Sequence, residues 1–170
     1  FYKKTKDSSG NSVIEALDLK TFEYKPKTSP RFESIGAARK AESLPHKLKI
    51  LAKGTDKAAN FMKALNLRVL AYSSKRIPEI ANHLYQIEDA MRAGFGWELG
   101  PFETRDILGV RKVADAMAEQ NIVPNIWVTE MLAAGIESFY KTENGARYYY
   151  DFAVQDYQVV PGTETSFVFL

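Results

Sequence analysis

The chain has 170 residues, 45% of them hydrophobic, and no cysteine. This composition is ordinary for a globular domain and excludes disulfides, thiolate metal sites and cysteine nucleophiles. No run approaches the roughly 18–20 apolar residues of a membrane span, and the N-terminus has no apolar stretch typical of a secretory signal, so we expect a cytoplasmic protein. The net charge of +2 hides an asymmetry: residues 1–60 hold 13 Lys/Arg and 7 Asp/Glu, whereas residues 61–170 hold 10 and 14.

Residues 1–30 are predicted to form an extended connector. A turn cluster at 8–11 and two prolines, Pro26 and Pro30, favour an extended chain. The lysines alternate with prolines, serines and acidic residues, without the aromatic interleaving of single-strand binders, so nucleic acid is not expected here. The chain begins with Phe1 and ends on the apolar residues 166–170, from which we expect a piece of a longer polypeptide.

Residues 31–141 are predicted to be helical. Ser29 and Pro30 form a plausible cap and first turn, and Thr55 or Asp56 is expected to cap a long helix. Ser73-Ser74 and Pro78 are expected to break or kink this helix, and apolar residues then recur at helical spacing from Ile77 to Met91 and beyond. Helix ends are expected near Gly54, Gly109 and Gly135. Four apolar residues are assigned to the core of this bundle: Phe61, Leu65, Leu84 and Ile87.

Residues 142–170 are predicted to be a β-rich tail. Asn144-Gly145 is a strong turn signal between β-prone segments, so we expect a hairpin or small sheet. No repeat of 20–50 residues is visible along the chain. The fold class is therefore mainly α, a helical bundle with a small β hairpin at the C-terminus.

The glycine-rich stretch 94–103 is the most informative part of the chain. Its glycines release the backbone and Pro101 suits a first helical turn, which predicts a helix end, an aromatic loop and a new helix start. The spacing of Gly94, Gly96 and Gly100 does not match a dinucleotide fingerprint, and a helix precedes it where a strand is needed. Trp97 and Phe102 are candidates for core packing, with an interface or acyl contact as alternatives.

The titratable residues offer weak candidates for chemistry. Glu79 and His83 are four residues apart and could share a helix face, either as an acid–base couple or as a plain i,i+4 contact. Two dispersed histidines support no zinc site. The carboxylates of the central segment are expected to be solvated; they are Glu88, Asp89, Glu98, Glu103 and Asp106. Glu103 and Asp106 lie in the first turns of a predicted helix, where the helix dipole favours negative charge.

Residues 85–109 resemble the C-terminal helical domain of 3-hydroxyacyl-CoA dehydrogenases. The resemblance rests on an acidic-x-Ala-Met-x-x-Gly block, then Gly-Pro-Phe-Glu, then Asp-x-x-Gly; the matching residues are Asp89, Ala90, Met91, Gly94, Gly100, Pro101, Phe102, Glu103, Asp106 and Gly109. Segments 76–81 and 127–135 are similar to the second helical repeat of multifunctional members that also carry an enoyl-CoA hydratase. Phe1 to Lys4 resembles the tail that closes the first repeat, and Phe139 to Lys141 the close of the second.

The resemblance implies a fold of the 6-phosphogluconate-dehydrogenase C-terminal-like type. It also implies a parent enzyme that oxidises L-3-hydroxyacyl-CoA with NAD in fatty-acid β-oxidation. The family's catalytic histidine–glutamate pair and its NAD fingerprint belong to a domain that no part of this chain matches. We therefore assign no catalytic, cofactor-binding or metal-binding residue here, and regard the loop as structural or interfacial: Gly94, Phe95, Gly96, Trp97, Gly100, Pro101, Phe102 and Glu103.

The leading hypothesis is a helical scaffold that lacks its NAD-binding domain and first repeat, is inactive alone, and forms a homodimer through an exposed apolar face. The alternative is a helical adaptor whose basic N-terminal segment engages an anionic partner. An independent enzyme that uses Glu79, His83 or Glu88 is a third possibility, with no geometry-defining motif behind it.

Overall fold

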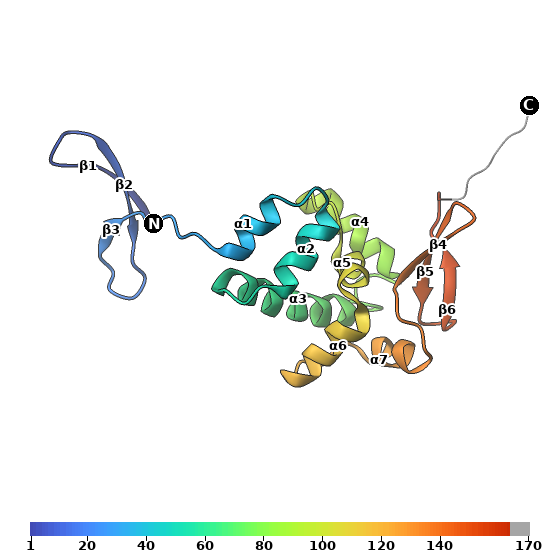
Figure 1. Ribbon diagram of the computed structural model, residues 1–170. Helices are drawn as coiled ribbons and strands as arrows, with labels where there is room; N and C mark the ends of the chain where they lie inside the picture. Colours follow the sequence, from blue (N-terminus) through green and yellow to red (C-terminus); the bar gives the residue numbers. More distant parts are fainter. Residues whose placement is uncertain (164–170) are drawn as a thin grey trace, which may run out of the picture. The chain divides into compact units, whose positions relative to one another are not determined.

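A computed structural model describes residues 1–163 as two compact units, one of residues 1–31 and one beginning at Phe32 (Figure 1). Among the described residues, no helix is long and apolar enough to cross a membrane. Seven helices and two small antiparallel sheets make the described chain mainly α, in agreement with the sequence-based expectation.

The first unit is a three-stranded antiparallel sheet, where the sequence indicated only an extended connector. Its strands are β1 (Tyr2–Lys6), β2 (Ser12–Leu17) and β3 (Tyr24–Pro26), paired in chain order. The turn cluster at 8–11 closes the first hairpin, and the Asp7 carboxylate accepts hydrogen bonds from the N–H groups of Ser9 and Asn11. Pro26 ends the edge strand β3, a position that proline tolerates because no ladder donor is needed there.

The second unit begins with helices, and its long third helix is capped by Asp56, one of the two expected residues. The Asp56 carboxylate accepts a 2.9 Å bond from the Ala59 N–H and also binds Ser34 in the first helix, so one cap joins two helices. The first helix starts after Phe32, not at the Ser29–Pro30 pair. The helices are α1 (Glu33–Arg39), α2 (Leu44–Lys53), α3 (Lys57–Lys75), α4 (Leu84–Phe95), α5 (Pro101–Leu108), α6 (Val110–Glu119) and α7 (Ile126–Ala133).

The helical prediction was wrong at residues 76–83, which form turns between α3 and α4. A proline has no N–H for the helical ladder and its ring crowds the preceding turn, so Pro78 explains the interruption. The core assignment was also partly wrong, because the outer face of α3 exposes Phe61 by 65% and Leu65 by 43%. Leu84 is buried and Ile87 partly buried against the core, as expected.

The core lies where α3, α5, α6 and α7 meet the second sheet. Phe102, Trp127 and Phe139 form its aromatic centre, with ring centroids 5.1–6.0 Å apart in tilted and edge-on arrangements. Leu70, Val110, Met117, Val128 and Met131 fill the surrounding space and are fully buried.

The second sheet comprises β4 (Tyr140–Glu143), β5 (Ala146–Asp151) and β6 (Asp156–Val159), all antiparallel. The expected turn at Asn144-Gly145 joins β4 to β5, and both residues have the positive φ that such a tight hairpin requires. A third strand extends the predicted hairpin into a small sheet. Residues beyond 163, which the sequence assigned to the same tail, lie outside the described part of the chain.

The two sheets are copies of one design, although no repeat is visible in the sequence. Tyr2 pairs with Ala16 as Tyr140 pairs with Tyr149, and Ala16 pairs with Lys25 as Tyr149 pairs with Gln158. The hydrogen bonds that flank the strands also correspond: Leu17 N–H to Phe1 O and Tyr150 N–H to Phe139 O, then Lys27 N–H to Ile14 O and Val160 N–H to Arg147 O. Few side chains are shared, chiefly a Phe-Tyr-Lys start, an aspartate at the end of the second strand and a tyrosine in the third, so the repeat is not visible in the sequence.

Candidate functional site

The glycine-rich stretch forms the expected helix end, loop and helix start. The α4 helix ends at Phe95, and Gly96 closes it in the left-handed conformation with φ 64°. Gly100 then caps α5, and Pro101 is the first residue of that helix. The left-handed conformation at Gly96 favours glycine, whereas Gly100 is extended, a conformation open to any residue.

Glu88 on α4 is buried beneath this loop, in contrast to the solvated position that the sequence favoured. Its side chain is 1% exposed, and Oε1 accepts hydrogen bonds from the N–H groups of Phe102 at 2.6 Å and Glu103 at 3.1 Å. The carboxylate thus caps α5 from outside that helix. Burial raises the pKa of Glu88 to about 7, although the two N–H donors act in the opposite direction.

Gly100 is required by the position of Glu88. A Cβ atom on Gly100 would lie 1.0 Å from Glu88 Oε2 and 2.2 Å from its carboxyl carbon. Any other residue at this position would push the carboxylate away from the α5 N-terminus. The glycine of the Gly-Pro-Phe-Glu motif is thereby explained by close approach of a buried side chain.

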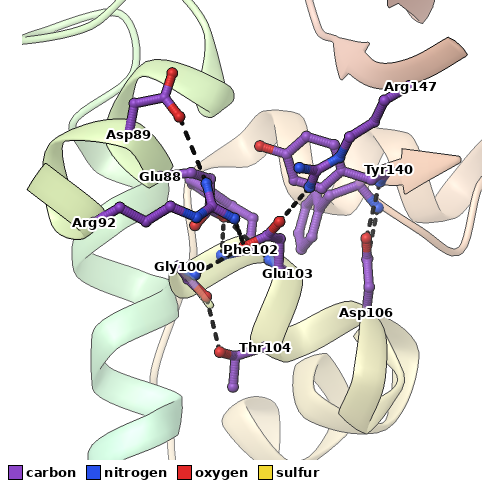
Figure 2. A network of polar contacts seen from close by, with 11 residues as sticks. Glu88, Asp89, Arg92, Gly100, Phe102, Glu103, Thr104, Asp106, Tyr140 and Arg147 are labelled. Carbon is purple, nitrogen blue, oxygen red and sulfur yellow. Dashed lines mark hydrogen bonds and ion pairs between the residues drawn. The ribbon is translucent and has the colours of Figure 1, made fainter. Parts of the chain in front are cut away.

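Glu103 joins the loop to the second sheet. Its Oε2 accepts a 2.9 Å bond from the Gly100 N–H and an ion-paired bond from Arg92, while its Oε1 binds the Arg147 guanidinium on β5 (Figure 2). These donors lower the pKa of Glu103 against the opposing effect of burial. The motif spacing places this glutamate at the third helical position, where it can reach back to the cap residue.

Asp106 holds the start of β4. Its two carboxylate oxygens accept hydrogen bonds from the N–H groups of Phe139 at 2.7 Å and Tyr140 at 2.9 Å (Figure 2). Burial raises the pKa of Asp106 to about 7. The aspartate of the Asp-x-x-Gly block therefore serves the junction of helix and sheet, beyond the helix-dipole role predicted for it.

These three carboxylates form one network that connects α4, α5, β4 and β5. Each accepts hydrogen bonds from backbone N–H groups, arginine or both, so the arrangement positions the elements that carry these donors. Within the described residues Glu88 Oε2 is buried without a hydrogen-bond partner. Among residues 1–163, no group of three or more His, Cys, Asp or Glu side chains is placed to hold a metal ion. The sequence singled out these three carboxylates, with the expectation of solvated or helix-terminal positions. It missed Arg147 and Tyr140, which pack together with the guanidinium 4.1 Å from the ring centroid.

The aromatic residues of the loop differ in how far they are exposed to solvent. Phe102 is fully buried in the core, while Trp97 is 40% exposed and Phe95 74% exposed. Of the alternatives left open from the sequence, core packing is correct for Phe102 but does not describe Trp97. Asp89 and Glu98 are exposed, as expected for solvated carboxylates.

The Glu79–His83 pair predicted from its spacing does not form. Glu79 pairs instead with Arg76 at 2.9 Å, because residues 76–83 are not helical. His83 Nδ1 lies 3.0 Å from the Tyr149 hydroxyl and 3.4 Å from Asp151 Oδ2, and its ring stacks on Tyr85. This second polar cluster links the start of α4 to β5, and no local sequence signal connects residues so far apart.

The network includes Gly100, Glu103 and Asp106, which also carry the resemblance to 3-hydroxyacyl-CoA dehydrogenases. Comparison with known proteins tests that resemblance. A probable 3-hydroxyacyl-CoA dehydrogenase of Bacillus subtilis is 36% identical over 151 residues, which cover 89% of this chain. The chain is a homologue of the 3-hydroxyacyl-CoA dehydrogenases. A putative fatty acid oxidation complex trifunctional enzyme of Rickettsia prowazekii is 24% identical over 98 residues, or 56% of the chain.

This homologue of the dehydrogenases spans only 18% and 12% of the length of those two relatives. No family model matches the chain, and no solved structure matches it significantly. The resemblance inferred from residues 85–109 is thus confirmed by a relative that is named as a probable 3-hydroxyacyl-CoA dehydrogenase.

Proposed function

We propose that this chain is the second helical repeat of an NAD-dependent L-3-hydroxyacyl-CoA dehydrogenase of fatty-acid β-oxidation, together with the strands that close the first repeat. In that role it is a scaffold of the 6-phosphogluconate-dehydrogenase C-terminal-like type in a cytoplasmic multifunctional enzyme. The NAD site, the acyl-CoA substrate and the catalytic pair belong to other parts of the parent, so the isolated chain is inactive.

The duplicated sheet is the observation that carries this proposal. Residues 1–27 and 139–160 share strand order, pairing register and flanking hydrogen bonds. The second copy follows the helices of its unit and packs into their core through Phe139, Tyr149 and Tyr150. A first copy built in the same way is best explained as the close of an earlier helical repeat in the longer protein.

The carboxylate network supports a scaffold in preference to a catalytic site. The motif residues Gly100, Glu103 and Asp106 are occupied in holding α5, the loop and β4 together. A catalytic base needs a carboxylate or imidazole free to reach a substrate proton. The motif in this unit is therefore proposed to maintain the shape of a domain that packs beside the active site.

Homodimerisation of the isolated chain remains part of the proposal. The outer face of α3 exposes Phe61, Leu65 and Tyr72, at 65%, 43% and 63%. These residues are spaced at i, i+4 and i+11 and so form one stripe along the helix. An apolar stripe of this kind is typical of a contact surface, and light scattering that gives a monomer mass in dilute solution would contradict the dimer.

Isothermal titration of the purified chain with NAD, acetoacetyl-CoA and CoA tests the proposed role. We expect no heat of binding with NAD and no turnover of acetoacetyl-CoA with NADH. Saturable NAD binding would overturn the assignment of the NAD site to another domain. Binding of CoA alone would change the role from scaffold to part of the substrate site.

A further inference from the structure

The helical unit is divided into a basic and an acidic half. Residues 33–75, which form α1 to α3, contain nine Lys/Arg and three Asp/Glu, a formal charge of +6. Residues 76–163 contain seven Lys/Arg and thirteen Asp/Glu, a formal charge of −6. The net charge of the chain conceals this separation, which creates a strong local field on the side of α2 and α3.

A groove of about 940 Å³ lies between α2 and α3 of the basic half and the α5–α6 junction of the acidic half. Its walls are largely apolar and include Leu48, Leu51, Leu67, Ile107 and Val113. Four lysines line it as well, namely Lys49, Lys53, Lys63 and Lys112.

The charge of the groove is not neutralised within the described chain. Lys63 donates to the Gly54 carbonyl, but Lys49, Lys53 and Lys112 form no ion pair with any residue in 1–163. Asp106, the acidic residue beneath them, is engaged with the N–H groups of Phe139 and Tyr140. Glu119 is the remaining acidic residue of the lining.

The α2 helix forms one wall of the groove and is left incompletely covered. It is amphipathic, yet none of its residues is buried, unlike every other helix described here. Leu48 and Leu51 remain half-buried although both face the groove. An amphipathic helix with no buried residue has an apolar face that a further element can cover.

We propose that this groove receives an amphipathic helix with an acidic face from a partner protein. The apolar floor accepts side chains at i, i+3, i+4 and i+7, the usual spacing of a helix bound in a groove. The lysines at the rim then pair with carboxylates on the flanks of that helix. The ten residues of α2 offer a wall of about 15 Å, enough for roughly three turns of a bound helix.

Charge complementarity favours this occupant over the alternatives. A polyanion such as nucleic acid would neutralise the lysines but leave the leucine floor uncovered. A purely apolar helix would leave the ammonium groups without partners. The proposal does not depend on the dehydrogenase assignment, since it rests on the groove and its charges alone.

The test uses fluorescence anisotropy with a labelled 14-residue peptide of leucine and glutamate in amphipathic order. Two control peptides have the same leucines with lysine in place of glutamate, and the same composition in scrambled order. We expect the acidic amphipathic peptide to bind at least tenfold more tightly than either control. Its affinity should fall several-fold between low and high salt, because exposed charge pairs are screened.

A pair of double variants locates the binding surface. Lys53→Glu with Lys112→Glu reverses charge at the groove, and we expect it to weaken binding about tenfold. Lys40→Glu with Lys75→Glu makes the same change in net charge on α1–α3 residues outside the groove lining, and should have a much smaller effect. All four lysines are exposed, so both variants should fold.

Three results would overturn the proposal. One is equal binding of the scrambled peptide, and another is an equal loss of affinity in both double variants. The third is a change from dimer to monomer caused by the groove variant alone, which would show that a second copy of this chain occupies the groove.

Discussion

The two copies of the sheet have the same backbone and opposite environments. Phe139 at the start of the second copy is fully buried, whereas the equivalent Phe1 is 87% exposed. Tyr150 packs in the core and is only 3% exposed. Its counterpart in β2, Leu17, is half-buried. Within residues 1–31 the sheet has no helix to cover it.

The comparison shows what the strands need beyond their own hydrogen bonds. Backbone pairing is alike in both copies, so the difference in burial comes from the elements against which β4–β6 pack. In the second copy the Asp106 carboxylate accepts hydrogen bonds from the N–H groups at the start of β4. The Phe139 ring packs against the rings of Trp127 and Phe102. An isolated small sheet is only marginally stable in water, so the first copy should be the weaker of the two.

The largest expected effect comes from truncating the equivalent phenylalanines. Phe139→Ala removes a buried ring in contact with two other aromatic residues and should lower the free energy of unfolding by about 3–5 kcal/mol. Phe1→Ala alters an exposed side chain and should change it by no more than about 0.5 kcal/mol. Urea unfolding followed by tryptophan fluorescence measures the effect of both variants on the helical unit, in which Trp97 and Trp127 lie.

Equal losses in the two variants would mean that Phe1 is covered in solution. The comparison of the two copies would then fail, and the first sheet would need a partner surface within the chain. A small effect of Phe139→Ala would instead contradict its place at the centre of the core.

The two units should also respond to pH in separate ranges. Glu88 and Asp106 have pKa values raised to about 7 from 4.5 and 3.8, so the folded state retains protons that the unfolded state has lost. The stability of the helical unit should therefore fall as pH rises from about 4.5 to 7 and level off above that. For Glu88 the expected change is on the order of 3 kcal/mol, from about 1.4 kcal/mol per pKa unit.

The first sheet behaves in the opposite way. Asp18, at the turn after β2, has a pKa lowered to about 2, mainly by its hydrogen bond to Lys25. Its contribution is present at neutral pH and is lost as pH falls from about 3.8 to 2. Urea midpoints of the helical unit measured from pH 4.5 to 8 test the first statement, with Glu88→Gln as the variant that should flatten the slope. An unchanged slope in that variant would assign the effect to Asp106 or elsewhere.

The sequence predicted the local features of the helical unit well and its long-range contacts poorly. Helix ends at Gly54 and Gly109, the Asp56 cap and the Asn144-Gly145 turn all follow from short-range backbone rules. The burial of Glu88, by contrast, depends on the loop and on α5, which bring the N–H groups of Phe102 and Glu103 over its carboxylate. A single sequence does not reveal which carboxylate on α4 faces that helix end.

The first sheet was missed for a related reason. Three of the five residues of β1 are lysines and β3 has only three residues, so neither segment shows the alternation of apolar and polar residues that predicts a strand. The register that identifies it as a copy of β4–β6 is a property of pairing between segments. Only the flanking Phe-Tyr-Lys is visible in the sequence, where its resemblance to the family predicts the end of a repeat.

The smallest changes in the free energy of unfolding are expected from alanine substitutions at two glycines, Gly100 and Gly94. At Gly100 the close approach of Glu88 decides the effect, and at Gly94 the helix propensity of alanine does. Gly100→Ala places a Cβ within 1.0 Å of Glu88 Oε2, which must displace the carboxylate and leave the α5 N–H groups without an acceptor. The loss of a buried acceptor of this kind should cost about 1–3 kcal/mol. It should also remove part of the pH dependence described for Glu88, since the displaced carboxylate gains water.

Gly94→Ala is the matched control, because a Cβ at Gly94 would meet nothing within 4 Å and the residue lies in the last turn of α4. Alanine is the better helix former, so this variant should be neutral or more stable by up to about 1 kcal/mol. Unfolding in urea at pH 8 distinguishes the pair. If both variants are neutral, the close approach of Gly100 and Glu88 does not stabilise the start of α5, and the second sheet is held by Asp106, Glu103 and its aromatic side chains without that contact.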